Sequence, residues 1–327
     1  MERKESGFLR EHGRNLGMLF TLSCALGALA IFSPKYVTFD NLVVVALQMA
    51  FIGIACLGAT YLIISGNIDL SIGSIFALTA VVAAMLAKSM PPLVAMLLAV
   101  LLGGLLGLVN GWLVWRVKLS PIIITLGTMA VLRGVVLLLT GGYSIRSVPK
   151  EFSVFAQTRL VGIPMPVIVL ILLALSLHFL FTRTTIGRHV FAIGGNREAC
   201  HAVGIPVRRL VLGAFVSNGL IVGLAGVLTA GRFGSASPAF GVSLELDVIT
   251  AVILGGVAFN GGRGNILGVL LAVTLLGVIS SGIVSLGINP HCADIIKGVA
   301  LIIAVVLDQL SQEARERFQK NLAKSDR

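Results

Sequence analysis

Ten apolar segments with little charge, separated by short polar ones, constrain this chain more than any other feature of its sequence. Most are close to the roughly 20 residues that an α-helix needs to cross the hydrocarbon core of a membrane. Transmembrane β-strands are about half as long, so the lengths favour a helical bundle over a barrel. The segments lie at approximately 16–33, 42–64, 70–87, 92–115, 121–140, 164–181, 210–230, 246–258, 266–286 and 293–310.

Composition agrees with this assignment. Apolar residues make up 57% of the chain and charged residues only 12%, whereas soluble domains have about a quarter charged residues. The formal charge of +11 would suggest nucleic acid as a partner of a soluble domain, but here the basic residues occupy short segments between apolar spans. We therefore expect membrane lipid around the chain and no nucleic acid. The predicted fold is an all-α polytopic membrane bundle of about ten transmembrane helices, forming one transmembrane domain over 1–327.

The basic residues also predict the topology. If the N-terminus is cytoplasmic, seventeen of the 25 Lys and Arg fall in inside segments and six in outside loops. We therefore expect both termini inside: a cytoplasmic N-terminal segment 1–15, a cytoplasmic loop 182–209 and a cytoplasmic tail 311–327, with 141–163 on the opposite side. The first span follows a leader with three Glu residues, which favours a retained helix over a signal peptide. The span 246–258 is short enough to be a half-helix.

The two halves of the chain resemble each other. The run from Asp69 is echoed from Asp247, Val109-Asn110-Gly111 by Ser280-Ser281-Gly282, and Arg133-Gly134-Val135 by Lys297-Gly298-Val299. The copies begin on opposite sides of the membrane in the predicted topology, which is typical of the inverted repeats of transporters. Chance resemblance between apolar segments is the alternative.

Small residues recur at intervals of four, as in Gly103, Gly107 and Gly111, and again in Gly219 with Gly223. This spacing lets helix backbones approach closely. We expect packing inside one subunit rather than a dimer seam.

The motifs of common enzymes are missing. The chain has no G-x-x-x-x-G-K-[ST], no H-E-x-x-H and no G-x-S-x-G. Its four cysteines lie far apart, and its five histidines lack metal-ligand spacing. We therefore expect no catalytic residues, no metal and no cofactor in this chain, and no ATP hydrolysis by it.

Ionisable residues at membrane depth usually mark function or a pairing partner. Asp69 and Asp247 each open a short span at corresponding points of the two halves, where helix capping and a place on a transport pathway are both open and compatible. For Arg133 and Asp308 we expect snorkelling or capping. The candidate pathway residues are Asn67, Asp69, Ser71, Glu245 and Asp247.

The loop 182–209 is the most informative polar segment. Gly194-Gly195-Asn196 is interpreted as a turn in which Asn196 is an N-cap, and 197–203 as a short helix that ends at Gly204. A short capped helix on the cytoplasmic face suits the docking of a partner.

A family resemblance rests on four ordered motifs that span nearly the whole chain. The motifs are Ser65-Gly66-Asn67-Ile68-Asp69-Leu70-Ser71-Ile72-Gly73, then Thr125-Leu126-Gly127-Thr128 with Arg133-Gly134, then Thr184-Thr185-Ile186-Gly187-Arg188 with Gly194-Gly195-Asn196, Ala199 and Gly204-Ile205, and finally Leu254-Gly255-Gly256 with Gly261-Gly262-Arg263-Gly264. In these motifs and their order, the sequence resembles the permease subunits of bacterial ATP-driven (ABC) monosaccharide importers, the ribose, arabinose, galactose and xylose group.

The resemblance implies a permease homodimer in the bacterial inner membrane, a periplasmic sugar-binding protein and a separate cytoplasmic ATPase that binds ATP and magnesium. It also implies a coupling helix that docks on this ATPase, with Gly194, Gly195, Asn196, Glu198, Ala199, Gly204 and Ile205 as its residues.

Two alternatives stay open. One is a related importer for branched-chain amino acids or nucleosides, which the motifs do not exclude. The other is a secondary sugar symporter, which would need a coupling carboxylate in the central third of a span, where this sequence has none. The motifs do not name the sugar.

Overall fold

The computed structural model describes residues 2–325, with side chains described for 13 and 15–310, and it is almost wholly α-helical. Residue 1 and residues 326–327, at the outer ends of the predicted segments 1–15 and 311–327, lie outside the described residues. In chain order the elements are α1 (Glu2–Phe32), η1 (Pro34–Val37), α2 (Phe39–Ile64), α3 (Ile72–Leu86), α4 (Pro92–Val117), α5 (Pro121–Thr140), α6 (Lys150–Gln157), β1 (Arg159–Leu160), β2 (Ile163–Pro164), α7 (Met165–Arg183), α8 (Thr185–Gly195), α9 (Arg197–Ala202), α10 (Val207–Phe233), α11 (Leu244–Leu254), α12 (Ile266–Ser285) and α13 (His291–Ser325).

Each of the ten predicted spans coincides with a helix, but the helices differ in length. Seven of those in the described part of the chain are long and apolar enough to cross a membrane: α1, α2, α4, α5, α7, α10 and α12. The all-α polytopic membrane fold is therefore confirmed, and the count of ten transmembrane helices is approximate.

Two of the predicted spans form short helices. Helix α3 has 15 residues and α11 has 11, so α11 covers about 17 Å, roughly half of the hydrocarbon core. The predicted span 246–258 was therefore too long at its C-terminal end. The chain leaves the helix at Gly255 and Gly256, and Gly256 has the positive φ of 88° that glycine adopts without a steric penalty.

The order of helices recurs in the two halves. In the first, the long helix α2 is followed by the short α3 and then by α4 and α5; in the second, the long α10 is followed by the short α11 and then by α12 and α13. The echoes seen in the sequence fall on corresponding helices of these two series. An inverted relation between the halves remains a prediction.

The core consists of α2, α3 and α10, most of whose side chains are buried. Helix α10 packs along α4, α3 and α2. Added methyl groups at Gly103 and Gly219 would each collide with the backbone carbonyl of the other glycine, so the small residues bring α4 and α10 into backbone contact. The predicted packing role of these glycines inside one subunit is confirmed.

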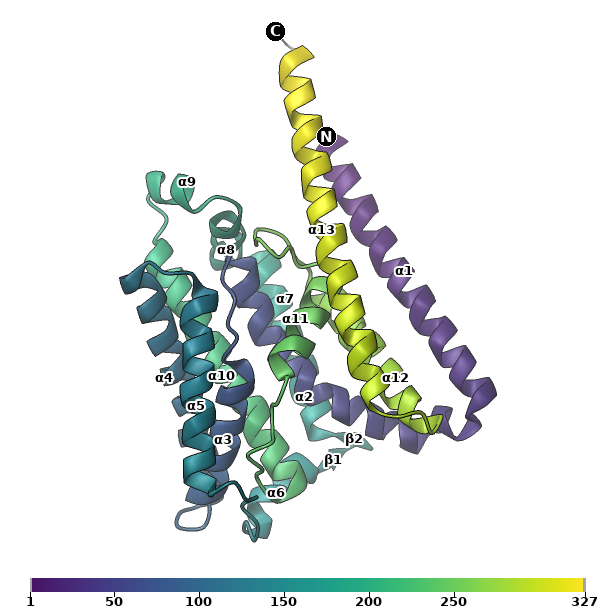
Figure 1. Ribbon diagram of the computed structural model, residues 1–327, viewed down its shortest axis with the longest axis vertical. Helices are drawn as coiled ribbons and strands as arrows, with labels where there is room; N and C mark the ends of the chain where they lie inside the picture. The colour runs from purple at the N-terminus through teal and green to yellow at the C-terminus, as the bar shows by residue number, and fades with distance from the viewer. Residues whose placement is uncertain (1, 326–327) are drawn as a thin grey trace.

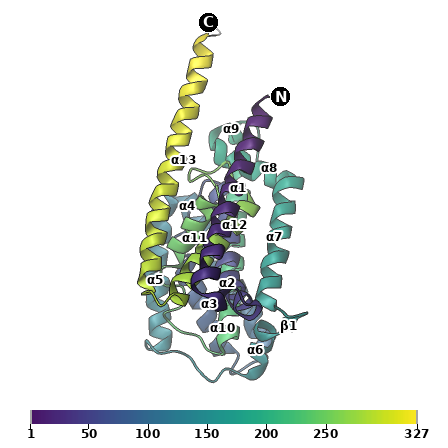
Figure 2. The same ribbon diagram turned by 90° about the vertical axis from the view of Figure 1, so that its right-hand side faces the viewer.

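The molecule has two distinct ends. Both termini, α8 and α9 lie at one end, whereas α6 and the small antiparallel hairpin of β1 and β2 lie at the other (Figures 1 and 2). That 1–15, 182–209 and 311–327 lie on the cytoplasmic side of the membrane, and 141–163 on the opposite side, stays a prediction.

Candidate functional site

The predicted loop 182–209 contains two helices instead of one. Helix α8 starts after Thr184, whose hydroxyl caps it by accepting a hydrogen bond from the amide of Gly187 at 3.1 Å. It continues through Gly194 and Gly195, so these two glycines do not form the turn that the sequence suggested. Only Asn196 separates α8 from α9. Helix α8 was not predicted from the sequence because its three glycines are typical of a loop.

Helix α9 has the predicted cap and stop. The Asn196 side-chain oxygen accepts a hydrogen bond from the amide of Ala199 at 2.9 Å, which satisfies one of the free donors at the helix start. Gly204 follows with φ 79°, and the amide of Ile205 donates to the carbonyl of Cys200 at 3.0 Å. The short helix is therefore fixed at both ends.

One face of α9 is anchored and the other is open. Cys200 is buried, whereas Glu198, Ala199, His201 and Ala202 are exposed. The following Val203 is 75% exposed. Glu198 lies in the first turn, where a carboxylate suits the positive end of the helix dipole. The outer face thus presents the small and apolar Ala199, Ala202 and Val203, together with the His201 imidazole and a favourably placed negative charge.

Arg197 connects α9 to the interior. Its guanidinium donates a hydrogen bond to the side-chain oxygen of Asn67 at 3.2 Å. Asn67 is buried in the non-helical break between α2 and α3, where its side-chain nitrogen also donates to Ser65. Burial lowers the pKa of Arg197 below its ordinary value, yet an arginine stays charged in proteins.

Gly194 lies where three backbone segments meet. A methyl group on it would overlap the carbonyl oxygen of Ile64, at the end of α2, and the amide nitrogen of Gly262, between α11 and α12. The Gly262 amide in turn donates to the Ile64 carbonyl at 2.9 Å. We call this contact of the α8 end, the α2 end and the α11–α12 loop the glycine junction.

Asp69 and Ser71, two of the candidate pathway residues, belong to a buried polar network. One Asp69 carboxylate oxygen accepts from the amide and hydroxyl of Ser71, at 2.8 and 2.6 Å, and the other accepts from the Asn218 amide at 3.1 Å. Asn110 donates to the Ser71 hydroxyl at 2.9 Å and accepts from Thr128 at 2.8 Å. A buried carboxylate needs such donors, so this network ties α3, α4, α5 and α10 together.

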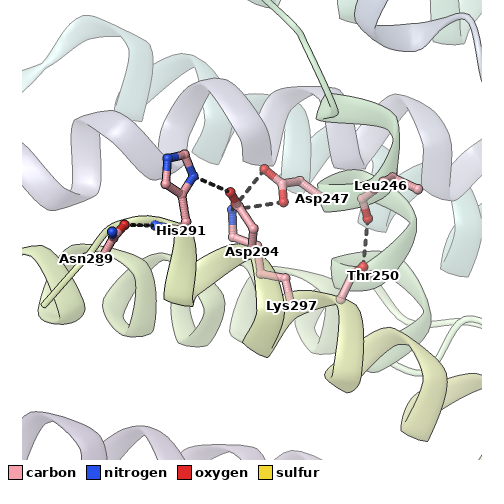
Figure 3. Close-up of polar contacts among 7 residues, drawn as sticks. All are labelled: Leu246, Asp247, Thr250, Asn289, His291, Asp294 and Lys297. Atoms are coloured by element: carbon pink, nitrogen blue, oxygen red, sulfur yellow. Dashed lines mark hydrogen bonds and ion pairs between the residues drawn. The ribbon is translucent and has the colours of Figure 1, made fainter.

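The other two candidate pathway residues lie in the first turn of α11. Asp247 forms an ion pair with Lys297 of α13, with 2.9 Å between the carboxylate and ammonium groups, and Asp294 lies 4.0 Å from the same ammonium (Figure 3). Glu245 instead faces Gly73 of α3. The structure therefore separates the five candidates into an Asn67, Asp69 and Ser71 cluster and a Glu245 and Asp247 pair.

Arg133 and Asp308 make tertiary contacts, so the expectation of simple snorkelling or capping was wrong for both. The Arg133 guanidinium donates to the carbonyls of Pro238 and Phe240, at 2.9 and 3.0 Å, and holds the segment before α11. Asp308 accepts from the amide of Phe259 at 3.1 Å and lies 4.0 Å from Arg263, next to the glycine junction.

Within the described residues, no group of three or more His, Cys, Asp or Glu side chains is placed to hold a metal ion. The membrane-crossing helices define a multi-pass membrane protein, and the exposed capped helix α9 lies outside the bundle at the same end as both termini.

A family model described as "Branched-chain amino acid transport system / permease component" matches residues 41–305, so the chain belongs to this family of transport permeases. The match includes every candidate site residue.

Three curated relatives are similar along almost their whole length. The D-allose transport system permease protein AlsC of Escherichia coli strain K12 is 37% identical over 90% of this chain and 91% of its own. The ribose import permease protein RbsC of Bacillus subtilis strain 168 is also 37% identical, over 90% of this chain and 93% of its own. The L-arabinose transport system permease protein AraH of Escherichia coli strain K12 is 33% identical, over 91% and 92%. No solved structure matches the chain significantly.

Proposed function

We propose that this chain is the membrane permease subunit of an ATP-binding-cassette importer, and that it moves a monosaccharide delivered by a periplasmic binding protein. The observation that carries the proposal is the similarity, over nine-tenths of the chain, to permeases named for D-allose, ribose and L-arabinose. Because these relatives are named for three different sugars at comparable identity, the proposal extends to the sugar class and not to one sugar.

ATP hydrolysis belongs to a separate cytoplasmic subunit in this proposal. The sequence contains no phosphate-binding G-x-x-x-x-G-K-[ST] motif, so the permease needs a partner to use ATP and magnesium, and it is not itself an enzyme. Transport follows when the ATPase closes on ATP and shifts the permease between its inward-open and outward-open states.

Helix α9 is proposed as the coupling helix that docks on this ATPase. Its support is an exposed face of small and apolar side chains on a helix capped by Asn196 and ended at Gly204. The proposed docking residues lie in α9 and in the segments directly before and after it. They are Gly194, Gly195, Asn196, Glu198, Ala199, Gly204 and Ile205.

The proposed orientation in the bacterial inner membrane places α9 and both termini in the cytoplasm. The excess of Lys and Arg in the segments at that end supports this orientation. The hairpin of β1 and β2 then faces the periplasm, where the binding protein would dock.

The two clusters of candidate pathway residues receive different proposed roles. Asn67, Asp69 and Ser71 are buried and hydrogen-bonded, Asp69 with Ser71 and Asn67 with Ser65, which suits residues that move with the pathway wall. Glu245 and Asp247 are only partly buried at the start of α11, which suits contact with the pathway.

A homodimer is the proposed assembly. Helix α5 supports it because most of its side chains are not buried, and it exposes apolar residues such as Ile123, Val131 and Leu138 to lipid or to a second copy. Intersubunit crosslinking of a cysteine at Val131 in membranes would yield a dimer of this chain. If this cysteine crosslinks only to a different permease chain, the assembly is a heterodimer and the proposed homodimer is wrong.

Reconstitution tests the function directly. The permease, the ATPase and the binding protein are placed in proteoliposomes with ATP inside, and uptake of radiolabelled D-ribose, D-allose, L-arabinose, leucine and a nucleoside is measured. We expect ATP-dependent uptake of at least one sugar. Uptake of leucine alone would favour the branched-chain amino acid alternative, which the wording of the family description suggests. Uptake of sugar without the ATPase, driven by a proton gradient, would favour a symporter.

A further inference from the structure

A cavity of about 450 Å³ lies between α2, α11, α12 and α13. Its lining runs from Tyr36 and Asn41, around the start of α2, to Ser285 at the end of α12. These positions are close to the end of the molecule opposite α9, where α1 ends and α13 begins (Figure 1). On the proposed topology, the cavity is therefore near the periplasmic side, where a delivered sugar would enter.

The lining of this cavity is unusually polar for a site among apolar helices. It includes the Asp247–Lys297 ion pair of Figure 3, the Gln48 amide and the Ser280 and Ser281 hydroxyls. Polar groups in contact with hydrocarbon are costly, so their convergence on one space indicates polar contents rather than lipid tails.

Two of these groups have no partner among the described residues. The Ser280 hydroxyl is buried and makes no hydrogen bond, although a serine in a helix can bond to its own backbone. Gln48 of α2 is exposed and lines the cavity, and its side chain likewise makes no hydrogen bond to another described residue. By contrast, the Ser281 hydroxyl is occupied by the Tyr36 hydroxyl at 2.5 Å.

The chemistry of the lining selects the class of ligand. Serine hydroxyls and the glutamine amide each donate and accept hydrogen bonds, the carboxylate accepts and the ammonium donates. Asp247 and Lys297 are the charged residues of the cavity lining and their charges cancel, while Asp294 lies outside the lining, so the lining presents no net charge to an ionic ligand. A neutral molecule with several hydroxyl groups matches this set, and the volume is in the range of small-molecule sites.

We infer that this cavity binds the transported monosaccharide within a single permease chain, with Ser280 and Gln48 as hydrogen-bonding residues. The inference rests on the proposed function and adds a binding site to it. The Asp247–Lys297 pair forms one wall of the site, which gives the partly buried Asp247 a contact with the sugar.

Binding is measured on the permease in lipid nanodiscs without the binding protein. Saturation-transfer difference NMR detects weak association with D-ribose, D-allose and L-arabinose, and empty nanodiscs provide the blank. The test variants are Ser280→Ala and Gln48→Leu, which remove polar groups with little change of volume. The control is Thr274→Val, because this hydroxyl lies on the same α12 outside the cavity lining and bonds to its own helix at Leu270.

We expect the wild-type chain and Thr274→Val to bind one of these sugars, and each test variant to bind it roughly three- to tenfold more weakly. Equal binding by all four proteins, or none by any, would overturn the inference. Uptake by the reconstituted wild-type importer separates a failure of the proposed binding site from a failure of the proposed function. If sugar is taken up but binding does not depend on Ser280 or Gln48, the cavity is not the binding site and the transport function stands. No uptake of any sugar would overturn both.

Discussion

The guanidinium of Arg197 hydrogen-bonds the side chain of Asn67, 3.2 Å away and 130 residues earlier in the chain. One residue begins the exposed helix α9, and the other lies in the buried break that precedes α3. Two residues beyond Asn67, the carboxylate of Asp69 joins α3 to α10. A movement of α9 would therefore reach the core through this polar contact and the short segment that follows it.

Removal of this contact should uncouple transport from ATP hydrolysis. In Arg197→Ala, we expect sugar imported per ATP to fall roughly tenfold, because a hydrogen bond from a charged donor contributes about 1.5–3 kcal/mol. The ATPase should still co-purify. Arg208→Ala, which removes an exposed arginine from the start of α10, is the control. A wild-type ratio of sugar to ATP in the Arg197 variant would show that the contact carries no coupling.

Docking itself should depend on Ala199. A tryptophan at this exposed position should clash with the ATPase, so Ala199→Trp should abolish both co-purification of the ATPase and uptake. Asn196→Ala should be milder, because loss of a helix cap costs about 1 kcal/mol. Val161→Trp, at a position 94% exposed at the opposite end, should leave co-purification unchanged. Normal ATPase binding and uptake by a membrane-inserted Ala199→Trp protein would remove the docking role from α9.

The glycine junction predicts a contrast between two adjacent residues. Gly194→Ala should destabilise the protein by about 1–3 kcal/mol, because the added methyl group overlaps two backbones. Gly195→Ala should be close to neutral, since nothing described lies within 4 Å of the added group. Thermal unfolding of both variants in the same detergent measures the difference. Equal stabilities of the two variants would mean that the backbones of the glycine junction accommodate the added methyl group without any loss of stability.

The Asp69 network predicts sensitivity to the loss of one acceptor. In Asp69→Asn, an amide nitrogen would replace one of the two carboxylate oxygens and would face a hydrogen-bond donor, from either Ser71 or Asn218. The donors left without an acceptor should lower the free energy of unfolding by about 1–3 kcal/mol. Asp40→Asn, on the exposed first turn of α2, should change stability little. A smaller loss of stability at Asp69 than at Asp40 would contradict the network's structural role.

Topology can be tested with two matched valines. With the four native cysteines replaced by serine, a membrane-impermeant maleimide should label Val161→Cys in intact spheroplasts. It should label Val203→Cys only after the membrane is opened. Both positions are exposed, whereas Ser153, which shares the proposed periplasmic segment with Val161, is buried and would label poorly. The reverse labelling pattern would invert the proposed orientation.

The sequence predicted the parts of this fold that depend on hydrophobicity and local capping. Apolar runs are long enough to place the helices, and the oxygen of Asn196 caps the helix that follows it. The interior polar partnerships could not be predicted in this way. Asn110, Thr128 and Asn218 are far apart in the chain, and only the packing of α4, α5 and α10 around α3 brings them to Asp69 and Ser71.

Glycines were the least predictable residues of the candidate site. A pair of glycines before an asparagine is typical of a turn, yet Gly194 and Gly195 continue α8. Position 194 requires a glycine because its backbone contacts Ile64 and Gly262, which are distant in the sequence. Local sequence patterns do not predict such a contact.

At the glycine junction, no side chain separates the three converging backbones, and this has a mechanical consequence. Side chains can change rotamers and so absorb a displacement, whereas touching peptide groups pass it on directly. One contacting segment closes the long helix α2 in the first half of the chain, and the other links α11 and α12 in the second half. A displacement of α8 toward the bundle would thus reach both halves of the chain at the same time.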